Sequence, residues 1–89
     1  MADTFQLQVT TPERLVVDEQ VTSAQIPGKE GYMGILAGHA PLLSALRAGE
    51  LSYEGGGGPH RITVTGGFVE ISDNQVRVLA EGVESAQQG

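Results

Sequence analysis

The sequence predicts an all-β domain built as an antiparallel sandwich or barrel, and two patterns carry that prediction. Apolar and polar residues alternate with a period of two over most of the 89 residues, which is typical of half-buried strands. The alternating runs are short, and turn-forming residues such as glycine, proline, asparagine or aspartate separate them. Many short strands with a turn between each pair are typical of sandwiches and barrels, and a chain of this length forms one domain.

Three strands are predicted in the first 28 residues. In the first, apolar residues alternate with glutamine; the second is a run of three apolar residues, and Val21, Ala24 and Ile26 mark the third. A polar or proline-containing segment follows each of them and provides the stop. The predicted strands and their stops are residues 5–9 stopped by 11–13, residues 15–17 stopped by 18–19, and residues 21–26 stopped by 27–28.

Four further strands are predicted after residue 50. Each has two apolar residues in alternation, and a glycine-rich or Ser-Asp-Asn segment precedes the next one. The expected strands are residues 51–53, 62–64, 69–71 and 76–78, with turns at 55–58, 66–67 and 72–74.

A stretch of apolar residues between the two halves is interrupted by glycines at positions 28, 31, 34 and 38. Only glycine takes a positive φ without steric cost, so we expect sharp reversals there and a path that weaves through the core. On the same ground, replacing Gly34 or Gly67 with valine is expected to destabilise the fold by more than ~2 kcal/mol.

The segment 41–49 admits two interpretations. Pro41 suits a first helical position, Gly49 suits a helix stop, and the apolar spacing between them is compatible with two helical turns. A short strand accommodates the same residues. The pattern alone leaves both open.

Composition and charge exclude several classes of function. The net charge is −6 and the five basic residues are scattered singly, whereas nucleic-acid binding needs clustered lysine and arginine. An anionic lipid surface would repel such a chain. A protein partner fits better, and solubility alone explains the acidity equally well. There is no cysteine, which excludes disulfides and thiol catalysis, and no apolar run approaches the roughly 20 residues of a membrane span.

No group of residues indicates catalysis or cofactor binding. His39 and His60 have no suitably spaced carboxylate pair for a metal ion, and neither stands in a nucleophilic motif with a serine and an acid. Lys29 follows Gly28 but precedes Glu30, where a phosphate-binding loop has serine or threonine. We therefore expect no cofactor, no metal and no enzymatic activity.

Two blocks of the sequence resemble one known family. Gly31–Leu46, with Gly-His-Ala-Pro-Leu inside it and Gly49–Leu51 after it, is similar to the N-terminal domain of the epsilon subunit of F-type ATP synthases, called delta in mitochondria. The second block is Gly66–Ile71 followed by Asn74–Ala80, with Gly-Gly before one strand and Leu-Ala at the end of the next. With Phe5–Val9, the likeness spans nearly the whole chain.

The resemblance implies a flattened antiparallel sandwich of about ten short strands. It also favours a strand, and not a helix, at residues 42–47. It also implies a non-catalytic subunit of the rotor stalk, which binds the gamma subunit and rests on the polar loops of the c-ring without inserting into lipid. Such a subunit helps to couple ion flow to ATP synthesis, as a peripheral component at the cytoplasmic face of the inner (plasma) membrane.

The family's motifs also imply two sets of site residues. Those that face the gamma subunit are Thr11, Gly38, His39, Ala40, Pro41, Leu42 and Leu43. Those in the loop that faces the c-ring are Lys29, Glu30, Tyr32 and Met33.

Five of these residues allow a sharper expectation. Tyr32 stands where some relatives have an acid, which indicates a packing contact, and beside Met33 it would form a small exposed apolar patch. His39 is alternatively a turn residue whose ring bonds nearby backbone groups. On a strand, Leu42 and Leu43 face opposite sides, so one belongs to the core and the other is available to the gamma subunit.

We expect residues 1–84 to form the sandwich domain and 85–89 a disordered tail. Relatives usually continue into a helical hairpin that restrains ATP hydrolysis, so this chain is expected to lack that inhibition. The alternative function is a carrier domain of the lipoyl or biotinyl type, modified on Lys29, the sole lysine. Against it, glycine and glutamate flank Lys29, and the two halves of the chain lack the repeat that such domains have.

Overall fold

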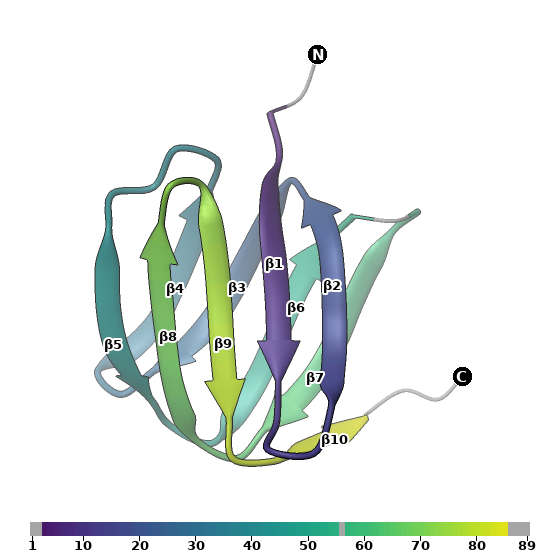
Figure 1. The fold of residues 1–89 in the computed structure, drawn as a ribbon, viewed down its shortest axis with the longest axis vertical. Helices are drawn as coiled ribbons and strands as arrows, with labels where there is room; N and C mark the ends of the chain where they lie inside the picture. Colours follow the sequence, from purple (N-terminus) through teal and green to yellow (C-terminus); the bar gives the residue numbers. More distant parts are fainter. Residues whose placement is uncertain (1–2, 56, 86–89) are drawn as a thin grey trace.

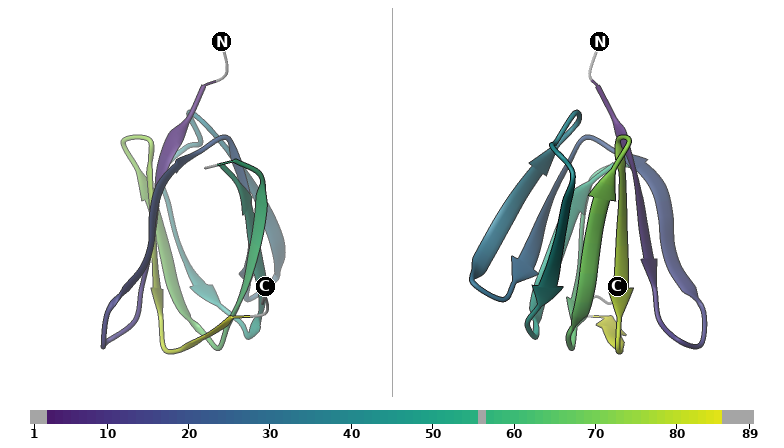
Figure 2. Two further views of the ribbon diagram at one scale, coloured as in Figure 1. Left: turned by 90° about the vertical axis from the view of Figure 1, so that its right-hand side faces the viewer. Right: turned by 60° about the vertical axis from the view of Figure 1, so that its left-hand side comes forward.

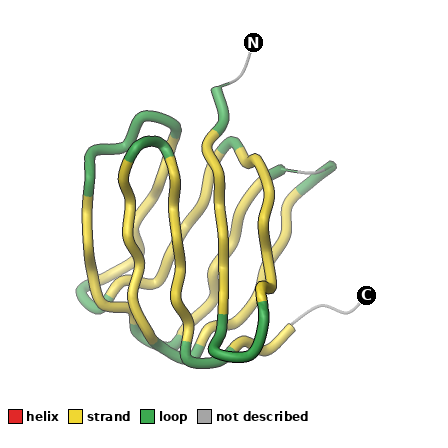
Figure 3. Tube along the Cα trace, viewed as in Figure 1, coloured by secondary structure: helices red, strands yellow, loops and turns green. Residues whose placement is uncertain are grey.

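The computed structural model describes residues 3–55 and 57–85, and these residues form ten strands (Figure 1). Short turns at both ends of the molecule connect the strands (Figure 3). The strands are β1 Phe5–Thr10, β2 Leu15–Val21, β3 Ser23–Gly28, β4 Gly31–Leu36, β5 Leu42–Leu46, β6 Gly49–Glu54, β7 Pro59–Val64, β8 Gly67–Ser72, β9 Gln75–Ala80 and β10 Val83–Ser85.

The strands form one sheet that curls into two facing layers, which Figure 2 shows edge-on. The front layer consists of β5, β8, β9, β1 and β2, and the back layer of β4, β3, β6, β7 and β10. The layers meet where the end of β3 pairs with the end of β5, at Gly28 and Leu46. All pairs are antiparallel except β1 with β9, which run in the same direction. The prediction of an antiparallel sandwich of ten short strands is confirmed.

The core lies between the layers and follows the predicted alternation. In β1 and β9 every second side chain is buried, so each strand gives one face to the core and one to solvent. Burial of each such side chain contributes roughly 1.5–3 kcal/mol before the conformational entropy is counted. Because aromatic residues are scarce, aliphatic side chains fill nearly all of this space. The largest fully buried side chains are Phe5, Leu7, Val9, Val21, Ile26, Ile35, Leu51, Val64, Val69, Ile71, Val76 and Val78.

Two boundaries in the first half of the chain differ from those predicted. β2 does not end at Asp18-Glu19 but continues to Val21, which therefore belongs to β2 and not to the third strand. The reason is that Asp18 and Gln20 point to solvent and preserve the alternation. Two charged residues in succession, Asp18 and Glu19, stopped the prediction, although Asp18 occupies an outward position where a half-buried strand tolerates charge.

The glycines of the middle segment do not all reverse the chain. Gly31 and Gly38 have φ of 140° and 83°, but Gly28 and Gly34 have no positive φ. Gly34 lies inside β4, and a Cβ there would meet nothing within 4 Å, so the expected strain at this position is wrong. At Gly67, with φ of 128°, the premise of the prediction is confirmed.

The segment 41–49 contains a strand and no helix, as the resemblance implied. β5 pairs with β8 along its whole length, from Leu42 opposite Ile71 to Leu46 opposite Gly67. The backbone hydrogen bonds of this ladder outweigh a weak helical propensity, since tertiary pairing decides short ambiguous segments. At the C-terminal end of the described chain, β10 ends at Ser85, the first residue of the predicted tail. Residues 86–89 of that tail lie outside the described residues.

Candidate protein-interaction site

The turn between β3 and β4 carries Lys29 and Glu30, two of the residues expected to face the c-ring. Both are exposed, and they form a two-residue connection between Gly28 and Gly31, which pair with each other. The backbone N–H of Lys29 donates to the carbonyl of Ala45 at 2.9 Å, which ties the turn to β5. The turn is thus held at a fixed position at one end of the molecule.

Tyr32 and Met33 follow this turn but lie on opposite faces of β4. Tyr32 is half exposed. Its hydroxyl accepts a hydrogen bond from the backbone N–H of Glu50 at 3.2 Å, and the Arg47 guanidinium lies 5.5 Å from its ring centroid. Met33 is partly buried and packs against the core. The expected exposed patch of both side chains is therefore not formed, because neighbouring residues on a strand point to opposite sides.

An open hollow of about 510 Å³ lies between the ends of β4 and β5. All four residues expected to face the c-ring line it, and so do Leu43, Ser44 and Ala45. The structure thus joins that loop to Leu43, a residue expected to face the gamma subunit.

The connection between β4 and β5 contains Gly38, His39, Ala40 and Pro41. Gly38, Ala40 and Pro41 are exposed and His39 is half-buried. The Nδ1 atom of His39 lies 2.7 Å from the carbonyl oxygen of Ala40, and its backbone N–H donates to Leu36 at 3.2 Å. His39 therefore stabilises its own turn through these two contacts, and the residue is also partly exposed to solvent.

Thr11 lies in the β1–β2 turn, at the other end of the front layer from His39 (Figure 1). Its hydroxyl accepts hydrogen bonds from the backbone N–H groups of Glu13 and Arg14 at 3.2 and 3.3 Å, which closes the turn. Thr11 and the 38–41 connection do not touch, so the residues expected at one interface form two separate groups.

An apolar row crosses the outer face of the front layer near Thr11, and Leu43 lies diagonally beyond it, toward the 38–41 connection. Leu42 packs inward against the core, while Leu43 is 72% exposed. Phe68, Leu79 and Leu15 are 55%, 54% and 50% exposed. Phe68 pairs with Leu79, Leu79 with Thr10, and Thr10 with Leu15, so these three lie in one row across β8, β9, β1 and β2. We call Leu15, Leu43, Phe68 and Leu79 the front patch.

Sequence reasoning missed three members of the front patch. Phe68 and Leu79 each stand next to an inward-facing residue, Val69 and Val78 respectively. A large apolar side chain out of phase with a clear alternation must face solvent, so the signal was present in the pattern. Leu15 was assigned to a strand without regard to the side it faces.

A shallow groove adjoins the front patch. Its volume is about 360 Å³, and Thr11, Pro12, Phe68 and Leu79 are among the residues that line it. Thr11 thus shares one surface with the patch. Glu70 and Arg77 are the next outward residues along β8 and β9 from Phe68 and Leu79. They form an exposed ion pair of 3.9 Å, which contributes little to stability.

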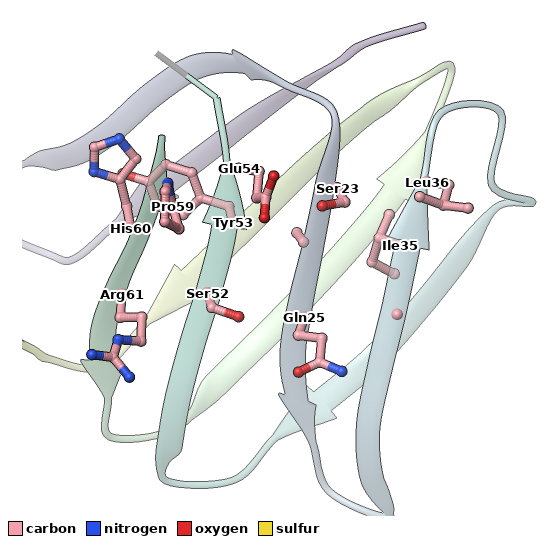
Figure 4. A pocket seen from close by; sticks show the side chains of 12 residues that line it. Ser23, Gln25, Ile35, Leu36, Ser52, Tyr53, Glu54, Pro59, His60 and Arg61 are labelled. Atoms are coloured by element: carbon pink, nitrogen blue, oxygen red, sulfur yellow. The ribbon is translucent and has the colours of Figure 1, made fainter. Parts of the chain in front are cut away.

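The outer face of the back layer also carries an exposed leucine, Leu36. It holds an open hollow of about 700 Å³, where Gln25, Ser52 and Arg61 lie side by side on β3, β6 and β7 (Figure 4). None of the residues expected at an interface lines it. Arg61 makes an exposed ion pair with Glu50 at 3.8 Å.

Within residues 3–55 and 57–85, no three histidine, cysteine or acidic side chains come close enough together to hold a metal ion. The described part of the chain also has no helix with the length and apolar character to cross a membrane. What the described residues offer is an apolar patch with a groove on one face, and an exposed charged turn at one end.

A family model and the sequences of known proteins agree on one family for this chain. Residues 4–86 match the model of the beta-sandwich domain of the ATP synthase delta/epsilon chain. The chain is 51% identical over 88 residues to the ATP synthase epsilon chain of Solibacter usitatus, covering 99% of this chain and 66% of that one. It is also 51% identical over 87 residues to the epsilon chain of Nitratidesulfovibrio vulgaris, covering 98% and 65%. It thus spans slightly less than two thirds of these relatives.

Solved structures agree. A chain in the mitochondrial ATP synthase of Euglena gracilis, a structure of OSCP, F1 and c-ring, superposes with a TM-score of 0.85 at 28% identity, over 92% of this chain and 53% of that one. A chain from the central stalk and c-ring of the Tetrahymena thermophila enzyme gives 0.75 at 17% identity, over 94% and 68%, and supports the fold alone. Lys29 does lie at a hairpin tip, but nothing in these comparisons supports a carrier domain. The chain belongs to the ATP synthase delta/epsilon family, and its described residues form the family's beta-sandwich domain.

Proposed function

We propose that this chain is a non-catalytic component of the central stalk of an F-type ATP synthase. It binds the gamma subunit through the outer face of the front layer and meets the c-ring through the β3–β4 turn, and so helps to couple ion translocation to ATP synthesis. The front patch is the observation that carries this proposal. Family membership supports the choice of complex, and the patch supports the choice of surface.

The front patch supports a protein partner for a physical reason. Each of its four side chains is at least half exposed, and they lie on one face of a small acidic domain. Grouped apolar side chains on a soluble domain mark an interaction surface, because water contact with them is unfavourable. The −6 net charge opposes nucleic acid and anionic lipid, which leaves a protein as the partner.

The gamma subunit is assigned to this face because the expected residues frame it. Leu43 belongs to the patch, Thr11 lines the adjoining groove, and the 38–41 connection lies beyond the upper end of the same layer. Leu42 stays in the core and supports Leu43 from below. The interface then extends over the front layer instead of forming one compact motif.

The c-ring is assigned to the β3–β4 turn. Lys29 and Glu30 are exposed there with opposite charges, and Tyr32 adds an aromatic face held by Arg47 and Glu50. Such a surface suits polar loops, since it offers charge, hydrogen bonds and a ring in a small area. Met33 supports this turn from the inside. The chain is then peripheral to the membrane at its cytoplasmic side and is held there by protein contacts.

The test is calorimetric titration of the chain into purified gamma subunit from the same source. We expect one-to-one binding by the wild-type chain and at least a roughly tenfold weaker affinity for Leu79→Ser, because a half-exposed leucine becomes fully buried in the complex. Leu36→Ser is the matched control. Leu36 is 65% exposed, but it lies on β4 in the back layer.

Three results are decisive. A loss confined to Leu79→Ser supports the front face. Equal losses of affinity for both variants would show that an exposed leucine contributes to binding whichever layer it lies on. That result would overturn the assignment of the gamma subunit to the front layer. Absence of binding by the folded wild-type chain would overturn the function itself.

A further inference from the structure

The β8–β9 turn consists of Asp73 and Asn74, and both have a left-handed backbone with φ of 52° and 59°. Two such residues in a row make the tight turn that joins twisted antiparallel strands. Asparagine tolerates this conformation better than most residues. The turn therefore accounts for the backbone of Asn74, but not for what its side chain does.

The side chain of Asn74 connects three segments that are distant in sequence. Its Oδ1 atom accepts a hydrogen bond from the backbone N–H of Gly38 at 2.8 Å. Its Nδ2 atom donates to the carbonyl of Thr4 at 2.8 Å. Its backbone carbonyl accepts from the N–H of Gln6 at 3.2 Å. A small hollow of about 300 Å³ is lined by Asp3, Thr4, Ala37, Gly38 and Asn74, which places these segments against one another.

The bond to Gly38 matters because the 38–41 connection has little else to hold it. It lies outside the strand pairings, Gly38 has φ of 83°, and three of its four residues are exposed. The other hydrogen bonds found for it are local, from His39 to Leu36 and within His39-Ala40. A connection that is free to sample many shapes loses that freedom on binding, which lowers affinity.

We propose that Asn74 is a positioning residue that holds the Gly38–Pro41 connection in the shape the gamma subunit binds. It contacts the connection through Gly38 and acts on the binding surface through it. This inference rests on the proposed function, because it assigns a role within the same interface. It adds a residue from the β8–β9 turn to an interface whose expected members lie in other parts of the chain.

Asn74→Gly is the informative variant. Glycine accepts the left-handed turn without strain, so the hairpin is kept while both side-chain hydrogen bonds are removed. In this variant we expect the amide of Gly38 to exchange at least roughly tenfold faster, measured by hydrogen–deuterium exchange in NMR spectra. We expect the affinity for the gamma subunit to fall roughly fivefold in calorimetry, since the connection must then be ordered on binding.

Two further variants separate the hydrogen bonds from the turn. Asp73→Gly makes the same backbone change at a residue whose side chain forms no hydrogen bond to the described residues, so exchange at Gly38 and affinity should both stay at wild-type values. Asn74→Asp keeps an acceptor for the Gly38 N–H but turns a carboxylate oxygen toward the Thr4 carbonyl. It should therefore retain protection at Gly38 and bind more tightly than Asn74→Gly.

The outcomes distinguish this inference from the function on which it rests. Slow exchange at Gly38 in Asn74→Gly would show that the side chain does not hold the connection. Fast exchange with unchanged affinity would show that its order is irrelevant to binding. Both results overturn the positioning role while the wild-type chain still binds. If the wild-type chain itself fails to bind the gamma subunit, the proposed function falls, and the role of Asn74 in it falls as well.

Discussion

At Gly67 the backbone has φ of 128°, and a Cβ built on it would overlap the carbonyl oxygen of Leu79 and come within 3.0 Å of the Ala80 Cα. Both neighbours belong to the backbone of β9, so they cannot rotate away as a side chain could. We expect Gly67→Ala to lower the free energy of unfolding by more than about 2 kcal/mol, from strain and a disturbed β8–β9 ladder. Urea denaturation followed by circular dichroism measures it.

Gly34 provides the matched control for that experiment. It lies inside β4 with an ordinary φ and open space where a Cβ would stand. Glycine weakens a strand interior by roughly 0.5–1 kcal/mol relative to alanine, so Gly34→Ala should leave stability unchanged or raise it. Similar losses at both positions would contradict the distinction drawn from their backbone angles.

Tyr53 makes the stability of the fold depend on pH in the alkaline range. Its side chain is 6% exposed, and burial raises the pKa of Tyr53 above its ordinary value of 10.0, with a further upward contribution from the negative charge of Glu19. A raised pKa in the folded state means that the unfolded chain loses this proton first. The contribution of Tyr53 to stability is therefore complete below pH 10 and is lost as pH rises through the folded-state pKa.

The corresponding experiment compares thermal melting of the wild-type chain and Tyr53→Phe between pH 8 and pH 11. The difference between them should be constant up to about pH 10 and should then move in favour of Tyr53→Phe. Tyr32→Phe is the control, because Tyr32 is half exposed. A constant difference over the whole range would show that Tyr53 ionises equally easily in both states.

Among the strands, β2 is the one whose free edge ends the front layer, and Glu19 occupies an inward position on it. Glu19 pairs with Leu7, which is fully buried. Its Oε1 atom is inaccessible to solvent and has no hydrogen-bond partner among the described residues. An unpaired buried acceptor costs about 1–3 kcal/mol, whereas an inward charge on an edge strand discourages pairing with another chain.

Glu19→Val should therefore be more stable as a monomer and less soluble. We expect a rise of about 1 kcal/mol in the free energy of unfolding, together with concentration-dependent association in sedimentation velocity. Asp18→Val is the control, since it changes charge equally but on the outer face of β2. A less stable monomeric Glu19→Val would indicate that the carboxylate supports the fold.

The elements that sequence reasoning recovered are those in which pattern and pairing agree. β1, β8 and β9 alternate cleanly, and turn residues bound them, so the strands could be predicted without knowing their partners. β5 could not be assigned from the pattern, because the choice between strand and helix depended on β8, which lies more than 20 residues away. β10 has only three residues and too little alternation to be noticed.

The site was predictable to a smaller extent. The turn with Lys29 and the connection with His39 could be located from their motifs, since turn residues mark such segments directly. That an apolar row crosses the outer face of the front layer depends on the register of four strands, which places Phe68 and Leu79 beside Thr10 and Leu15. Register is a property of the assembled sheet. The role of Asn74 likewise required knowing that Thr4 and Gly38 meet at its side chain.

On the scale of the whole molecule, both outer faces expose apolar side chains, but in different arrangements. The front layer presents the four side chains of the front patch, whereas the back layer presents Leu36 beside a hollow that Ser52 and Arg61 also line. Binding through the front layer should then be driven by apolar burial and should respond little to salt. Raising sodium chloride from 0.05 to 0.5 M should change the affinity for the gamma subunit by less than about threefold, with a negative heat-capacity change.

Calorimetry at several salt concentrations and temperatures tests this, with Arg61→Ala as the control for the back layer. A steep loss of affinity with salt would indicate an ionic interface, and a loss in Arg61→Ala would place that interface on the back layer. Either result would contradict binding through the front patch.

The place of β1 in the sheet has a consequence for how the protein is made. β1 lies between β2 and β9 and pairs with both. Gln6 and Gln75, which are far apart in the sequence, are therefore paired. A nascent chain can form the β1–β2 hairpin early, but a lone hairpin is marginally stable in water. The front layer closes only after the ribosome has released residues 75–80. Until then this strand, with three apolar side chains on one side, is available to a chaperone or to another unfinished copy.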